Sequence, residues 1–161
     1  EANGVATNLT HTRAAEGQTG SCLVLVTPDA ERSMCTFLGV SAELNDSALQ
    51  PKEIAKSRLY YMEGYLAASP TGLAAALQGK AHALAAGVPL ALTLSDVSMI
   101  RFCKAGLDAM LEGGVDFLFC NEEEAQVWTG LTDSAGREAY LAGRMATRKY
   151  ADPSSPLAGL I

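Results

Sequence analysis

Residues 115–124 are Val-Asp-Phe-Leu-Phe-Cys-Asn-Glu-Glu-Glu, and this stretch decides the fold class. Residues 115–120 are mostly apolar and β-prone, which predicts a buried strand. The polar residues that begin at Asn121 predict a helix start, because Asn is a good N-cap and acidic side chains complement the positive end of a helix dipole. A buried strand that leads directly into a helix is the basic unit of an α/β sheet.

The same order of elements occurs twice upstream. Residues 59–62 and 88–94 predict two more strands of nearly continuous apolar character. A helix follows each of them: Ser69 suits the N-cap and Pro70 the first position of one, and the other covers about residues 98–111. Apolar strands that alternate with helices predict a parallel sheet covered by helices on both faces.

The N-terminal part predicts a β-hairpin. Residues 21–26 and 33–40 are β-prone, and Thr27-Pro28-Asp29-Ala30 between them places Pro and Asp where a turn favours them. Two strands alone are only marginally stable. We therefore expect the hairpin to pack on the main domain, on further strands or on a partner chain.

The C-terminal part is less regular. A helix is predicted over residues 137–150, and Ala151-Asp152-Pro153-Ser154-Ser155-Pro156 ends it. Three strands are few for a doubly wound sheet. We therefore expect the chain to stop in the middle of its sheet.

Composition excludes several functional classes. The 161 residues are 48% hydrophobic, and 12 basic against 18 acidic residues give a net charge of −6, with the basic ones scattered. A nucleic-acid partner is therefore not expected. No run of 18 apolar residues and no signal peptide occurs, so we expect a cytoplasmic protein without a membrane partner. The four cysteines form no C-x-x-C pair and are expected to be reduced thiols in the core.

Polar residues follow each predicted parallel strand, at the sheet edge where α/β proteins bind ligands. They are Glu63-Gly64-Tyr65, Ser95-Asp96 and 121–124. Asn121 and Glu124 allow two interpretations. Asn-x-x-Glu is a variant of the capping box that closes a helix N-terminus. Alternatively, Glu124 holds a hydrated Mg²⁺ while Asn121 orients phosphate or metal-bound water. Both can hold together.

Several segments together resemble the PfkB/ribokinase family of kinases, in particular its adenosine kinase-like members. The segment 20–32 with 36–39 resembles the family's lid, and 63–66, 92–95 and 119–125 follow in the family's order. The resemblance covers roughly residues 4 to 130. It divides the chain into lid strands with a connecting segment (1–57), a central α/β portion (58–130) and a divergent C-terminal segment (131–161).

The resemblance implies a ribokinase-like three-layer α/β domain with a small β-sheet lid. It also implies transfer of the γ-phosphate of ATP, with Mg²⁺, to a hydroxyl of adenosine or another nucleoside, or of a sugar. By the same likeness Asn121 and Glu124 belong to the Mg²⁺ and phosphate network, with the metal reached from Glu124 through water. Arg32, Met34 and Thr36 lie on the lid strand that faces the substrate, and Tyr65 lies near the pocket. For Arg32, the alternative that it is a solvated charge in a turn stays open. For Met34 and Tyr65, the alternative that they only pack in the core stays open.

Two family features have no counterpart in residues 1–161. One is the Gly-rich N-terminal region with an Asp that grips sugar hydroxyls. The other is the C-terminal Gly-x-Gly-Asp motif, which supplies the general base and an anion hole. We therefore expect a fragment that does not transfer phosphate by itself. A ribokinase- or fructokinase-type sugar kinase, a non-catalytic module that keeps the lid and half the sheet, and a homodimer formed through the lid remain open.

Overall fold

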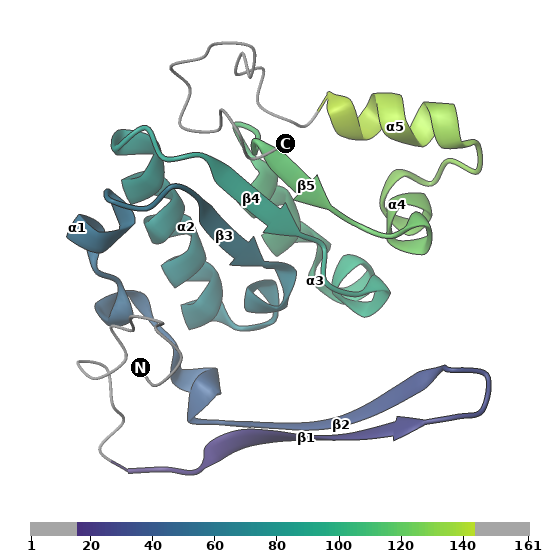
Figure 1. Cartoon of the computed structure of the whole chain (residues 1–161), viewed down its shortest axis with the longest axis horizontal. Helices are drawn as coiled ribbons and strands as arrows, with labels where there is room; N and C mark the ends of the chain where they lie inside the picture. Colours follow the sequence, from purple (N-terminus) through teal and green to yellow (C-terminus); the bar gives the residue numbers. More distant parts are fainter. Residues whose placement is uncertain (1–15, 144–161) are drawn as a thin grey trace.

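The computed structural model describes residues 16–143, which form two sheets and the helices around them (Figure 1). Strands β1 (Thr19–Val26) and β2 (Arg32–Gly39) form an antiparallel hairpin. Strands β3 (Tyr60–Glu63), β4 (Leu90–Thr93) and β5 (Phe117–Phe119) form a parallel sheet in that order. The predicted α/β class with a small separate β-sheet is confirmed.

Helices alternate with the parallel strands as the sequence predicts. They are α2 (Pro70–Ala85), α3 (Val97–Leu111), α4 (Glu122–Thr129) and α5 (Ser134–Ala142). Ser69 caps α2 by accepting a hydrogen bond from the Gly72 N–H at 3.3 Å, and Pro70 occupies the first turn. Because proline lacks an N–H and has its φ preset, it fits this first turn.

The core lies between one face of the parallel sheet and the helices. Met62, Leu90 and Leu92 of β3 and β4 are almost fully buried and belong to one cluster with side chains of α2, α3 and α4. The helical members of that cluster are Ile54 of α1 (Pro51–Ile54), Ala76 and Ala83 of α2, Ile100, Leu107, Met110 and Leu111 of α3, and Trp128 of α4. This cluster fixes where the carboxyl ends of the strands lie.

Among residues 16–143, the opposite face of the parallel sheet is more exposed than the face that packs on the core. Tyr61 and Phe119, which point to that face, are about half exposed, and their ring centroids lie 6.3 Å apart. Within residues 16–143, the helices that share the core cluster all pack on the face of Met62 and Leu92. The described part of the chain therefore contains one helical layer on its sheet rather than two.

The hairpin extends beside the α/β body rather than packing into it (Figure 1). Its turn is closed by the Thr27 N–H bonded to the Glu31 carbonyl at 3.0 Å. Large apolar side chains on both of its faces, such as Leu23 and Met34, are more than half exposed. The prediction of core cysteines is wrong for Cys22 and Cys35, which are exposed on the hairpin, while Cys103 and Cys120 are partly buried; all four are free thiols.

Residues 40–57 contain short helical turns that the strand and helix patterns do not predict. These are η2 (Val40–Glu43), η3 (Asp46–Ala48) and α1 (Pro51–Ile54). Another 3₁₀ turn, η4 (Gly64–Ala68), leads from β3 to α2. Helix α5 begins at Ser134, three residues earlier than predicted, because Asp133 caps it by accepting the Gly136 N–H. The predicted continuation to residue 150 and the proline segment 151–156 lie outside the described residues.

Candidate functional site

The three parallel strands end at the same edge of the sheet (Figure 1). Glu63, Thr93 and Phe119 are register partners across β3, β4 and β5. The residues that follow each strand therefore lie side by side, as the sequence predicts for this edge. This edge holds the turn after β3, the turn after β4 and the first turn of α4.

At the first turn of α4, Asn121 and Glu124 are hydrogen-bonded to each other. The Asn121 side-chain oxygen accepts the Glu124 N–H at 2.8 Å, and the Asn121 N–H donates to Glu124 Oε2 at 3.2 Å. The Asn121 amide also donates to Glu124 Oε1 at 3.0 Å. The capping-box interpretation is confirmed. Glu124 is only 7% exposed, so this carboxylate is buried and hydrogen-bonded on both oxygens.

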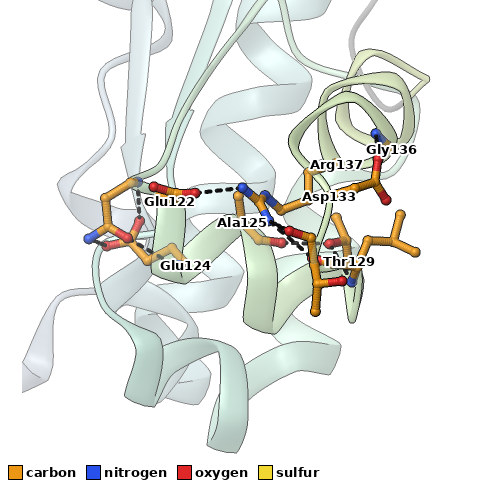
Figure 2. Close-up of polar contacts among 10 residues, drawn as sticks. Glu122, Glu124, Ala125, Thr129, Asp133, Gly136 and Arg137 are labelled. Carbon is orange, nitrogen blue, oxygen red and sulfur yellow. Dashed lines mark hydrogen bonds and ion pairs between the residues drawn. The ribbon is translucent and has the colours of Figure 1, made fainter.

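A buried arginine connects the same turn to α5. Figure 2 shows Arg137 reaching Glu122, with a 2.7 Å bond from its guanidinium to Glu122 Oε1. The Arg137 guanidinium also donates to the Thr132 carbonyl at 2.5 Å. A cavity of about 370 Å³ lies between α4 and α5, lined by Cys120, Asn121, Glu122, Ala125, Ser134, Arg137, Glu138 and Leu141. Arg137 was not among the predicted site residues, because no motif marks it.

The turns after β3 and β4 are in direct contact. A side chain at Gly64 would place its Cβ 2.7 Å from the Leu94 carbonyl oxygen and 2.8 Å from that of Thr93, so only glycine fits. Next to it, the Tyr65 hydroxyl donates to the Ser95 carbonyl oxygen at 3.4 Å. Tyr65 is 46% exposed, which excludes simple core packing for its ring.

Burial and the charged groups at this edge of the sheet shift the pKa of Tyr65. Partial burial raises the pKa of Tyr65, and the negative charges of Asp96, Glu124 and Glu63 raise it further. The positive charge of Arg32 opposes them and lowers the pKa. An arginine at the start of β2 therefore lies close enough to this edge to influence it electrostatically.

The other two predicted lid residues share a strand face with Arg32. In β2, residues 32, 34 and 36 alternate with those of the other face, and their partners on β1 are Val26, Val24 and Cys22. Met34 is 52% exposed, so the core-packing interpretation of its side chain is wrong. The Thr36 hydroxyl is 3.3 Å from Cys22 Sγ.

The fit of a magnesium ion to this edge of the sheet depends on the oxygen ligands that its residues offer. In residues 16–143, no three His, Cys, Asp or Glu side chains are grouped to hold a metal ion directly. Each oxygen of the buried Glu124 carboxylate accepts one hydrogen bond from Asn121. The donor set therefore fits a Mg²⁺ that phosphate oxygens and water hold, with Glu124 reached through water, because Mg²⁺ usually keeps several of its waters.

None of the described helices has the length and apolar character needed to cross a membrane.

Comparison with known proteins places this geometry in a family. The family model described as "pfkB family carbohydrate kinase" matches residues 1–148. The structure of adenosine kinase from Sinorhizobium meliloti superposes with a TM-score of 0.73 and 34% identity, over 79% of this chain and 39% of that one. A probable sugar kinase from Rhizobium etli superposes with a TM-score of 0.72 and 31% identity, over 78% of this chain and 38% of that one.

Curated relatives match over shorter stretches. An uncharacterized sugar kinase, YegV of Escherichia coli, is 45% identical over 58 residues, which are 36% of this chain and 18% of the relative. A thiazole synthase from Novosphingobium aromaticivorans is 84% identical over 31 residues, which are 19% of this chain and 12% of the relative. The chain thus spans under a fifth of these two curated relatives and about two fifths of the two solved kinases.

Proposed function

The chain belongs to the pfkB family of carbohydrate kinases, and from this premise we propose that it is part of an ATP-dependent kinase that phosphorylates a hydroxyl group of adenosine, another nucleoside or a sugar. The observation that carries the proposal is the Asn121–Glu124 pair, a buried carboxylate and an amide at the carboxyl end of β5. Open α/β sheets bind their ligands at this edge.

In this proposal the pair acts on the phosphate end of the nucleotide. Phosphoryl transfer needs positioning and neutralisation of charge more than covalent participation of the protein. Bound Mg²⁺ would neutralise charge on the phosphate oxygens. Asn121 fixes the Glu124 carboxylate by two hydrogen bonds, one to each oxygen, so that it presents negative charge toward metal-bound water in one orientation. Glu122 is held separately by Arg137.

The acceptor side of the site would be formed by the hairpin and Tyr65. Arg32, Met34 and Thr36 are exposed on one face of β2. The influence of Arg32 on the pKa of Tyr65 supports the idea that this face is turned to the sheet edge. An aromatic ring together with an arginine can bind either a nucleobase or a sugar ring.

The class of acceptor is tested by phosphotransfer. Adenosine kinases and probable sugar kinases both superpose well on this chain. The whole kinase polypeptide that contains the chain should be assayed with MgATP and adenosine, ribose or fructose in turn. Turnover with adenosine alone supports the nucleoside assignment, and turnover with a sugar alone supports the sugar assignment. Absence of turnover with all hydroxyl acceptors would contradict the proposed function.

A parallel assay addresses the chain by itself. Residues 1–161 contain no Gly-x-Gly-Asp sequence to provide a general base. We therefore expect no phosphotransfer from this chain in the same assay. Clear turnover would contradict the proposal that the base lies elsewhere in the polypeptide. If both the chain and the whole polypeptide bind a ligand without turnover, the non-catalytic binding module is the better description.

A further inference from the structure

Ser95, directly after β4, has an unusual backbone conformation. Its φ is +72°, although it is not a glycine. The Asp96 N–H donates to the Leu94 carbonyl at 2.9 Å, so residues 94–96 form a γ-turn with a positive φ at its centre. This form of the γ-turn is rare and strained, and such strain persists only where surrounding contacts hold it.

Three contacts hold the turn in place. The Ser95 N–H donates to Thr93 Oγ1 at 3.2 Å, and the Ser95 carbonyl accepts the Tyr65 hydroxyl. The Asp96 carboxylate accepts the Ser98 N–H at 2.6 Å and so caps α3. The backbone of Ser95 is therefore bound on both sides, while its side chain takes no part in holding the turn.

The Ser95 hydroxyl is the exception in this hydrogen-bond network. Its oxygen is buried and has no hydrogen-bond partner among the residues that the structure describes. Leaving a buried hydroxyl unpaired costs free energy. Most buried polar groups in proteins are paired, so an unpaired one calls for an explanation, and a bound ligand group is one. Here it coincides with a strained backbone at the edge where ligands bind.

The position of Ser95 indicates what the missing partner is. Thr93 is the register partner of Phe119, and the Leu94 N–H donates to the Phe119 carbonyl at 3.0 Å. Tyr65, whose hydroxyl donates to the Ser95 carbonyl, also lies within the electrostatic influence of Glu124. The unpaired hydroxyl therefore belongs to the turn next to the Asn121–Glu124 pair.

We propose that Ser95 is a nucleotide-binding residue whose hydroxyl donates a hydrogen bond to a phosphate oxygen held beside Asn121 and Glu124. The inference rests on the proposed function and adds to it a residue in the turn that follows the central strand, β4. A phosphate oxygen is the fitting partner, because a hydroxyl donor needs an acceptor and anionic acceptors form the stronger hydrogen bonds. Since the oxygen is covered in the free chain, rotation of the side chain or relaxation of the γ-turn must expose it as the ligand binds.

The test is a ¹H–¹⁵N NMR titration of the whole kinase polypeptide that contains this chain with MgATP, with urea unfolding measured in parallel. The variants are Ser95→Ala and, as a matched control, Ser98→Ala, which removes an exposed hydroxyl three residues away. The amides of residues 95, 96 and 121 should shift in the unsubstituted chain. Ser95→Ala should weaken MgATP binding by about tenfold, the size expected for one hydrogen bond to a charged group. Its unfolding midpoint should be unchanged or higher, because the lost hydroxyl has no partner.

Three results would overturn the assignment. One is unchanged MgATP affinity in Ser95→Ala. Another is a loss of affinity that the fall in stability fully explains, or that Ser98→Ala shows equally. The third is a whole polypeptide that does not bind MgATP at all, which would contradict the proposed function as well. The proposed function is judged separately: if Ser95→Ala binds normally while Glu124→Gln does not, only the role of Ser95 fails.

Discussion

Asn121 and Glu124 are joined by three hydrogen bonds across the first turn of α4. Two of them form the capping box, and the third links the side-chain amide to the carboxylate. The same two residues therefore begin a helix and orient a buried negative charge. Variants that keep the first role and remove the second can separate stability from function.

Asn121→Ser separates these roles for the amide. Serine is about as good an N-cap as asparagine, but it has no side-chain amide to donate to Glu124 Oε1. We expect the free energy of unfolding to fall by about 1 kcal/mol from the lost hydrogen bond to the carboxylate, whereas Asn121→Ala, which also loses the cap, should lose about 2 kcal/mol. In the whole kinase polypeptide, phosphotransfer should fall in both variants. Urea unfolding and a coupled kinase assay measure the two effects, and normal turnover in Asn121→Ser would show that the amide only caps the helix.

Gly64→Ala should disturb the contact between the turns after β3 and β4. The new Cβ would lie within 3 Å of the Thr93 and Leu94 carbonyl oxygens, which belong to the backbone and move little. We expect a loss of about 1–3 kcal/mol in the free energy of unfolding. Gly143→Ala is the control, because its φ is −66° and its nearest contact is 3.4 Å. Equal stability of the two variants would contradict the close approach at Gly64.

Lys80 stabilises the end of α3 from the neighbouring helix. Its buried ammonium donates to the carbonyl oxygens of Met110 and Glu112 at 2.7 and 2.5 Å. Lys80→Met should leave these carbonyls unpaired and lower the free energy of unfolding by about 1–3 kcal/mol. Substitution of the exposed Lys52 by Met should have little effect.

Lys80 also makes stability depend on pH. Burial lowers the pKa of its ammonium, and Glu112 partly opposes this. Between the lowered pKa of the folded state and the ordinary value of about 10.4, the unfolded chain binds more protons. The free energy of unfolding should therefore gain a rising contribution as the pH increases through this window. Urea unfolding at a series of alkaline pH values should show the contribution in the unsubstituted chain and not in Lys80→Met.

Arg32→Met tests whether the hairpin lies near the sheet edge. The charge of Arg32 lowers the pKa of Tyr65, so its removal should raise that pKa further. The titration of Tyr65 can be isolated as the ultraviolet difference between chains with and without Tyr65→Phe. Lys104→Met is the control, since Lys104 stacks on Trp128 instead, 3.6 Å from the ring centroid. An unchanged pKa of Tyr65 in Arg32→Met would place the hairpin away from the edge.

Local sequence patterns predict most of the fold. Apolar runs predict all five strands that the structure describes. Ser69-Pro70 predicts the start of α2, and the cap at Asn121 predicts the start of α4. These signals act within a few residues. The prediction that Cys22 and Cys35 lie in the core is wrong, because both are exposed on the hairpin. Their strands have apolar side chains on both faces, and a sequence pattern does not reveal whether such a hairpin has a partner.

The candidate site is only partly predictable. The three strand ends and the Asn121–Glu124 pair follow from topology and capping rules. Arg137 lies 15 residues from Glu122, and the two meet only because α5 folds back on α4. The turn at Ser95 is held in part by Tyr65, 30 residues earlier in the chain, whose hydroxyl donates to the Ser95 carbonyl. Such relationships arise from tertiary packing, so no local pattern predicts them.

The most direct test of the kinase assignment is the Mg²⁺ dependence of phosphotransfer in Glu124→Gln, made in the whole polypeptide that contains this chain. Glutamine keeps one acceptor for the capping box, but its amide replaces the second oxygen, so one donor of Asn121 loses its acceptor and the free energy of unfolding should fall by about 1–3 kcal/mol. If Glu124 acts on the metal and phosphates, turnover at saturating MgATP should fall by at least about a hundredfold, or about 2.7 kcal/mol in activation free energy. Normal turnover and an unchanged Mg²⁺ requirement in a fully folded Glu124→Gln protein would contradict the account.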